Sequence, residues 1–145
     1  MSLKNWLDNG WLTEHETSTE EIRNLLGVAD RDLRDCQAAG LSADWRMNIA
    51  YNAALQVATA ALAVCGYRAS RDSHHYRVIQ SLAYTIAAKN ELVVQFDQFR
   101  KKRNIGGYEQ AGLVSDVEAD EMIAFARKLR NEVEEWIQRD YPQFM

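Results

Sequence analysis

The chain has few of the residues on which β-rich folds depend. It contains one proline, Pro142, and seven glycines among 145 residues. An all-β fold of this length needs many tight turns, and glycine and proline form most of them. Their scarcity argues against a β-sandwich or a barrel and favours long, uninterrupted helices.

Cysteine is also rare, and a long apolar run is missing. Cys36 and Cys65 form neither a CxxC motif nor a metal-ligand spacing, so we expect buried free thiols. The N-terminus holds no apolar core of a signal peptide, and we expect no segment that approaches the length of a membrane span. These features predict a cytoplasmic protein that does not contact a membrane.

The sequence lacks the motifs of common cofactor and metal sites. The pair Gly106-Gly107 is not part of a phosphate-binding loop, and the three histidines form no HxxxH or HExxH pattern. We therefore expect no cofactor and no metal. A net charge of −4 also argues against a protein that coats nucleic acid with its whole surface. This net charge is compatible with a local basic patch.

What the chain does contain is helical periodicity over almost its whole length. Serines that can cap a following helix stand at Ser18, Ser42, Ser73 and Ser115, and a further helix is expected to begin near Asn90. Residues 1–16 are interpreted as a short helix and turn. The chain is thus predicted to be a single all-α domain over residues 1–145, an up-and-down bundle of about five helices with a short N-terminal extension.

Four consecutive basic residues, Arg100 to Arg103, occupy the end of the fourth predicted helix. The apolar stripe of this helix continues to Arg103, which places that side chain on the packed face. A charge on a packed face needs a partner or a cavity. Arg103 is therefore interpreted either as part of a binding site or as one member of an ion pair with a carboxylate such as Asp97, Asp116 or Glu118.

Short connections would bring a second basic cluster to the same end of the bundle. The end of the second helix, the start of the third, the end of the fourth and the start of the fifth would then meet. The sequence leaves open whether residues 73–103 form one helix or two; one helix would separate the clusters by about 40 Å. With two helices, the predicted nucleic-acid-binding residues are Arg71, His74, His75, Arg100, Lys101 and Lys102.

Three stretches of the sequence are similar to one known family. They are the alanine-rich AYNAALQVATAALAVCGYR, then SHHYRVIQSL, then RKKRN, which together cover about residues 43–110. In these stretches the chain resembles the HEPN superfamily of small helical bundles, which includes ribonucleases and toxin components of prokaryotes. The resemblance implies an HEPN-like bundle and an RNA-related function.

The family motif consists of an arginine, a polar residue such as asparagine, and a histidine four to six residues after the arginine. Arg103 and Asn104 match the first two elements, whereas Tyr108 stands where a histidine is expected. The resemblance implies that Arg103 and Asn104 bind phosphate, with Tyr108 as a base contact or a poor acid–base group. A phenol is scarcely a base at neutral pH, so we expect weak or no RNA cleavage unless His74 or His75 substitutes.

The resemblance also implies partners. Family members are commonly homodimers whose motif segments face one another, and they often pair with a nucleotidyltransferase. We therefore expect a homodimer, with RNA and a nucleotidyltransferase-type protein as further partners. A second hypothesis is a non-catalytic helical interaction module whose basic end docks an acidic protein.

Overall fold

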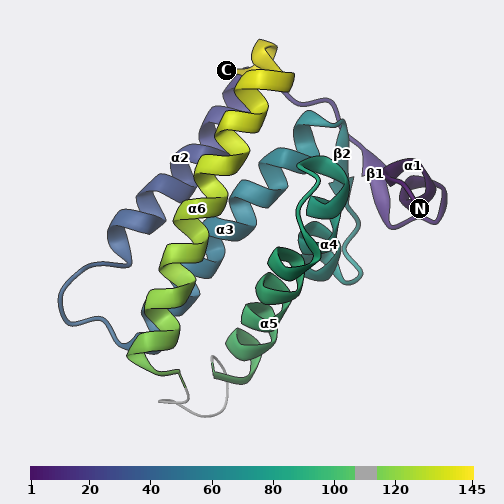
Figure 1. Ribbon diagram of the computed structural model, residues 1–145. Helices are drawn as coiled ribbons and strands as arrows, with labels where there is room; N and C mark the ends of the chain where they lie inside the picture. Colours follow the sequence, from purple (N-terminus) through teal and green to yellow (C-terminus); the bar gives the residue numbers. More distant parts are fainter. Residues whose placement is uncertain (107–113) are drawn as a thin grey trace.

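The computed structural model describes residues 1–106 and 114–145, with side chains for 1–103 and 114–145 (Figure 1). It is a helical bundle, which confirms the predicted all-α class. The elements of the described chain are α1 (Leu3–Asp8), β1 (Leu12–Glu14), α2 (Thr19–Asp35), α3 (Ala43–Val64), β2 (Tyr67–Ala69), α4 (His74–Thr85), α5 (Asn90–Gly106), α6 (Asp116–Asp140) and a final 3₁₀ turn (Pro142–Phe144).

Helix α3 is the centre of the bundle and packs against α2, α4, α5 and α6. Small residues make this possible, because alanine lets neighbouring helices approach closely. Contrary to our expectation, α3 is long and apolar enough to cross a membrane, yet 72% of its most apolar window is buried inside the protein. A core helix of a soluble protein has this property. Its fully buried alanines are Ala50, Ala53, Ala54, Ala58, Ala60 and Ala61.

The predicted helix starts are confirmed, with one difference in capping. The hydroxyls of Ser18, Ser42 and Ser115 accept hydrogen bonds from backbone N–H groups of the first helical turn, and Ser115 forms a reciprocal capping box with Glu118. Ser73 precedes α4 as predicted, but its side chain makes no capping hydrogen bond and its φ is 53°. In this left-handed conformation the hydroxyl does not cap the helix.

Helices α4 and α5 are separate. The chain leaves α4 through Ala87, which has a φ of 54°, and the Ala88 N–H donates to the Leu82 carbonyl at 3.0 Å. Helix α5 then begins at Asn90, where the sequence predicted a start. Because the chain reverses here, the start of α4 and the second half of α5 can lie together.

The N-terminal extension contains a strand that the sequence did not reveal. Strand β1 pairs antiparallel with β2, so that Leu12 lies opposite Ala69 and Glu14 opposite Tyr67. Trp6 packs with Leu12 and with Leu62 of α3. Each strand has three residues, and such short ladders depend on the packing around them.

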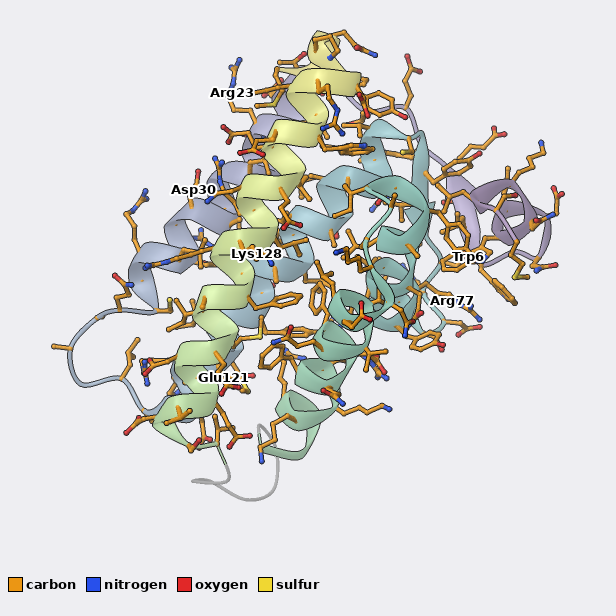
Figure 2. All side chains as sticks on the ribbon, in the orientation of Figure 1. Trp6, Arg23, Asp30, Arg77, Glu121 and Lys128 are labelled. Atoms are coloured by element: carbon orange, nitrogen blue, oxygen red, sulfur yellow. The ribbon has the colours of Figure 1, made fainter. Side chains whose placement is uncertain are left out.

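A cation–aromatic contact also joins the extension to α4. The Arg77 guanidinium lies 3.7 Å from the centroid of the Trp11 ring and 5.5 Å from that of Trp6. Figure 2 shows Trp6 and Arg77 together where α1 meets α4. The extension therefore covers the connection between α3 and α4.

Strand β2 changes the direction of the next helix. His75 at the start of α4 contacts Tyr51 in the first half of α3, whereas Tyr84 near its end stacks on Trp6, which packs against Leu62. Helix α4 therefore runs in the same direction as α3. The expected alternation of helix directions does not hold at this connection.

Helices α3 and α6 are also parallel. Arg46 near the start of α3 bonds Asp120 near the start of α6 at 2.7 Å, and Cys65 lies 3.7 Å from the Tyr141 hydroxyl where both helices end. The end of α3 and the start of α6 thus lie at opposite ends of the bundle. The expectation that they share one end was wrong, and β2 is the reason.

Candidate functional site

The start of α4 and the second half of α5 enclose an open hollow of about 510 Å³. Its described lining contains two arginines, two histidines, a tyrosine and a serine, and no aspartate or glutamate. In a protein with a net charge of −4, the positive charge of this lining comes from its two arginines, of which Arg100 also binds Asp97. The lining residues are Arg71, Ser73, His74, His75, Tyr76 and Arg100.

His75 is anchored by a buried phenol. The Tyr51 hydroxyl lies 3.1 Å from His75 Nδ1, and Tyr51 itself is only 1% exposed. Burial raises the pKa of Tyr51 to about 12, although the positive charges of Arg103 and Arg100 act in the opposite direction. Burial also lowers the pKa of His75, and Arg103, His74 and Arg100 add to this effect. Both groups are therefore neutral at neutral pH.

His74 is held by the strand that precedes it. Its Nδ1 lies 3.2 Å from the carbonyl oxygen of Ala69 in β2. A carbonyl only accepts hydrogen bonds, so Nδ1 must carry the hydrogen. The rings of His74 and His75 have centroids 6.1 Å apart, which places two imidazoles side by side in the hollow.

Arg103 lies beside this pair and forms no ion pair with another described side chain. Its guanidinium carbon is 5.0 Å from the centroid of the Tyr51 ring. The Nε atom is buried and has no hydrogen-bond partner among the described residues. The charge is thus held against an aromatic face, an arrangement worth roughly 1–2 kcal/mol when it is shielded from water.

The carboxylates that the sequence offered as partners of Arg103 are bound to other cations. None of the three forms an ion pair with Arg103, so that interpretation was wrong for the described side chains. Asp97 binds Arg100 at 2.7 Å and Lys101 at 3.5 Å. Asp116 binds Arg46 at 3.3 Å, and Glu118 binds Lys102 at 3.3 Å.

Tyr76 supplies an accessible aromatic ring at the rim of the hollow. It is 36% exposed, and the guanidinium carbons of Arg77 and Arg100 lie 5.5 and 5.6 Å from its centroid. A ring flanked by cations can stack on a nucleobase while the cations bind its phosphate. The site therefore offers both a charged and an apolar contact.

The structure unites some predicted site residues and separates others. Arg71, His74, His75 and Arg100 line the hollow, whereas Lys101 and Lys102 do not belong to its lining and bind carboxylates on the surface of α5 and at the start of α6. Solvated lysines at a helix C-terminus are common, since they interact favourably with its dipole.

Two predicted site residues lie partly or wholly outside the described part of the chain. Asn104 belongs to the last turn of α5, but its side chain lies outside the described part, and Tyr108 lies outside the described residues altogether. Sequence reasoning missed Tyr51. The available signal was a tyrosine within the alanine-rich part of α3, and it gave no indication of a histidine partner.

Among the described residues, no group of three or more His, Cys, Asp or Glu side chains could hold a metal ion. No protein-family model, curated protein or solved structure matches this chain.

Proposed function

We propose that this chain is an HEPN-like protein that binds the phosphate groups of single-stranded RNA, or of a nucleotide, in the hollow between α4 and α5. The observation that carries the proposal is the lining of the hollow, which has two arginines and two histidines and no described carboxylate. Phosphate groups carry negative charge on several acceptor oxygens, and arginine binds them in a bidentate manner.

The surroundings of Arg103 support a role in binding rather than in stability. A buried guanidinium nitrogen without a partner destabilises a fold, because its desolvation is not compensated. The neighbouring carboxylates, which might have neutralised Arg103, bind Arg46, Arg100 and the lysines. The positive charge of Arg103 is thus not neutralised by a described carboxylate, and it would attract a phosphate group bound in the neighbouring hollow.

The HEPN resemblance supports RNA as the ligand. Arg103 and Asn104, the two matched elements of the family motif, lie in the last turns of α5, and the charge of Arg103 acts on His75. Within this proposal the protein is cytoplasmic, is a weak ribonuclease or a descendant that only binds, and forms a homodimer. A nucleotidyltransferase-type protein is a further proposed partner.

The test is the affinity for a fluorescein-labelled single-stranded RNA, measured by fluorescence anisotropy over a series of salt concentrations. Binding should weaken steeply with salt, since phosphate contacts release counterions. Arg71→Ala should weaken binding about tenfold and reduce the salt slope by about 1. The matched control is Arg139→Ala, because Arg139 is also exposed and pairs with Asp140 at the far end of α6.

The proposal fails if the RNA does not bind at low salt, or if Arg71→Ala and Arg139→Ala weaken it equally. The interaction-module hypothesis makes a different prediction in the same assay. A labelled polyglutamate peptide would then bind in an Arg71-dependent manner, and RNA would not.

A further inference from the structure

The two neighbouring histidines of the hollow have different hydrogen-bond partners, and these partners fix opposite tautomers. His74 Nδ1 faces the Ala69 carbonyl at 3.2 Å. Nδ1 is therefore the protonated nitrogen, and the Nε2 of a neutral His74 carries a free lone pair.

His75 has the reverse arrangement. Its Nδ1 lies 3.1 Å from the hydroxyl of Tyr51, and no other acceptor for this hydroxyl exists among the described residues. The phenol is buried and keeps its proton. If it accepted a hydrogen bond from Nδ1–H, its own hydrogen would have no acceptor among the described residues, so the arrangement that satisfies the hydroxyl is donation to Nδ1. Nδ1 is then an acceptor, and Nε2 of the neutral His75 ring carries the hydrogen.

Both Nε2 atoms are available to a ligand. Neither has a hydrogen-bond partner among the described residues, and neither is a buried unsatisfied atom. Both rings line the hollow, with centroids 6.1 Å apart. The hollow thus presents a proton acceptor and a proton donor next to each other, each oriented from behind by the protein.

We propose that His74 Nε2 is the general base, and His75 Nε2–H the donor to phosphate, of a metal-independent cleavage of single-stranded RNA in this hollow. The proposal rests on the RNA-binding function proposed above and assigns its acid–base groups. These groups lie at the start of α4 and not in the segment that follows Arg103.

The chemistry is balanced without a cofactor. His74 Nε2 takes the proton of a ribose 2′-OH, and the 2′ oxygen forms a bond to the adjacent phosphorus. The bond from phosphorus to the 5′ oxygen of the next nucleotide breaks, which leaves a 2′,3′-cyclic phosphate. The 5′ oxygen takes a proton from water, and the resulting hydroxide takes the proton held by His74.

The donor and the arginines act on the developing charge. His75 Nε2–H can donate to a non-bridging phosphate oxygen whose negative charge grows during the attack. Arg100 and Arg103 lie beside this position and add positive charge. The lowered pKa of His75 keeps its ring neutral, so it serves as a hydrogen-bond donor and not as a competing base.

The tautomers can be measured directly and without RNA. Long-range ¹H–¹⁵N correlation NMR of protein labelled with ¹⁵N-histidine should show His74 protonated at Nδ1 and His75 protonated at Nε2. Tyr51→Phe, which removes only the hydroxyl, should shift His75 toward a mixture of tautomers and leave His74 unchanged. The proposal would be overturned if both histidines of the natural protein carried the hydrogen on the same ring nitrogen. It would also be overturned if the His75 signal did not change in Tyr51→Phe.

Cleavage of a fluorogenic RNA in EDTA tests the roles. His74→Gln should lower the cleavage rate by about 10²-fold or more and His75→Gln by about 10²-fold, while anisotropy shows that RNA binding is retained. Tyr51→Phe, a change to a positioning residue, should lower the rate less than His75→Gln. A substrate with a 2′-deoxy sugar at the cleaved position should resist. His15→Gln is the control, because His15 binds Glu21 outside the hollow.

The outcomes separate the two proposals. If RNA binds but is not cut, or if His74→Gln cuts as fast as the natural protein, the acid–base assignment is wrong and the binding function stands. If RNA does not bind, the binding function is wrong and the assignment falls with it.

Discussion

Arg103 is a residue whose placement lowers the stability of the fold. Its Nε is buried and has no hydrogen-bond partner in the described part of the chain, and its guanidinium lies against the face of Tyr51. Most buried arginines that stabilise a fold have a carboxylate in reach. This protein contains such a case in Arg130, which bonds Asp30 and Glu134 between α2 and α6.

Substitution by methionine should therefore change the free energy of unfolding differently at Arg103 and at Arg130. Arg103→Met keeps the apolar contacts and removes the unsatisfied group, so the free energy of unfolding should stay constant or rise by up to about 1 kcal/mol, while RNA binding weakens. Arg130→Met should lower the free energy of unfolding, because it leaves two carboxylates without their partner. Urea denaturation measures both. A strong loss of stability in Arg103→Met would return Arg103 to a structural role.

His75 gives the protein a pH-dependent stability. Its pKa in the folded state is lowered, first by burial, so the unfolded chain binds a proton more readily. The stabilising contribution is present above the unfolded value of about 6.5 and is lost as the pH falls through the lower folded value. The titratable and charged groups that face His75 are Tyr51 of α3, His74 of α4, and Arg100 and Arg103 of α5.

We expect the free energy of unfolding to fall between about pH 7 and about pH 5.5, and expect this fall to shrink in His75→Gln. Urea denaturation at both pH values is the measurement. Glu21 and Glu118 also have lowered pKa values. Their contribution to the free energy of unfolding is lost only at a more acidic pH, where these carboxylates become protonated. An unchanged pH dependence in His75→Gln would contradict the prediction.

At the scale of elements, α4 is bracketed by two residues in the left-handed conformation. Ser73 precedes it with a φ of 53°, and Ala87 follows it with a φ of 54°. For a residue with a Cβ this conformation costs about 1 kcal/mol or more, and glycine adopts it freely.

Ala87→Gly should therefore raise the free energy of unfolding by about 0.5–1 kcal/mol, once the greater freedom of glycine in the unfolded chain is included. Ala83→Gly makes the same chemical change at an exposed position inside α4. It should lower the free energy of unfolding by about 1 kcal/mol. Thermal denaturation compares the two, and a loss of stability in both variants would contradict the strain interpretation.

The pairing of β1 with β2 ties the N-terminal extension to the candidate site. β2 contains the carbonyl that holds His74, and the Ser70 N–H next to it donates to the Trp11 carbonyl at 2.9 Å. The stacking of Arg77 on Trp11 adds a contact from α4. A loosened extension should therefore release the segment that precedes the histidines.

Trp11→Ala should lower the free energy of unfolding by about 1–3 kcal/mol and speed hydrogen exchange of the amides in residues 66–72. Hydrogen exchange with mass spectrometry reads this segment directly. Trp45→Ala is the matched control, since Trp45 is 62% exposed at the start of α3. Equal protection of residues 66–72 in both variants would show that the extension does not hold the connection.

At the scale of the whole molecule, one end of the bundle carries large exposed apolar side chains. Trp45 and Val117 are 62% and 65% exposed. They stand at the starts of α3 and α6, which are joined by the bonds of Arg46 to Asp116 and Asp120. Exposed apolar residues that gather at one place mark sites of association more often than isolated ones do.

We propose that this end takes part in the homodimer that the HEPN resemblance implies. Light scattering at micromolar concentration should give the mass of two chains. Trp45→Ser should shift the measured mass toward that of one chain. Val94→Ser is the control, because Val94 is also exposed, at 44%, but belongs to the middle of α5. A monomeric natural protein would contradict the proposal.

The sequence by itself determined the helices of this protein. The caps at Ser18, Ser42 and Ser115 and the break before Asn90 were predicted because each depends on residues within one or two turns. The central position of α3 followed in the same way from its alanines. The charged end of α5 and the histidines of α4 were also visible as separate clusters.

Only the tertiary structure decided how these clusters meet and which side chains they contact. Strand β2 pairs with a strand more than fifty residues earlier, and this pairing sets the direction of α4. That direction in turn gives His75 its partner Tyr51. Contacts between distant segments depend on the path of the whole chain, and no local pattern of residues encodes that path.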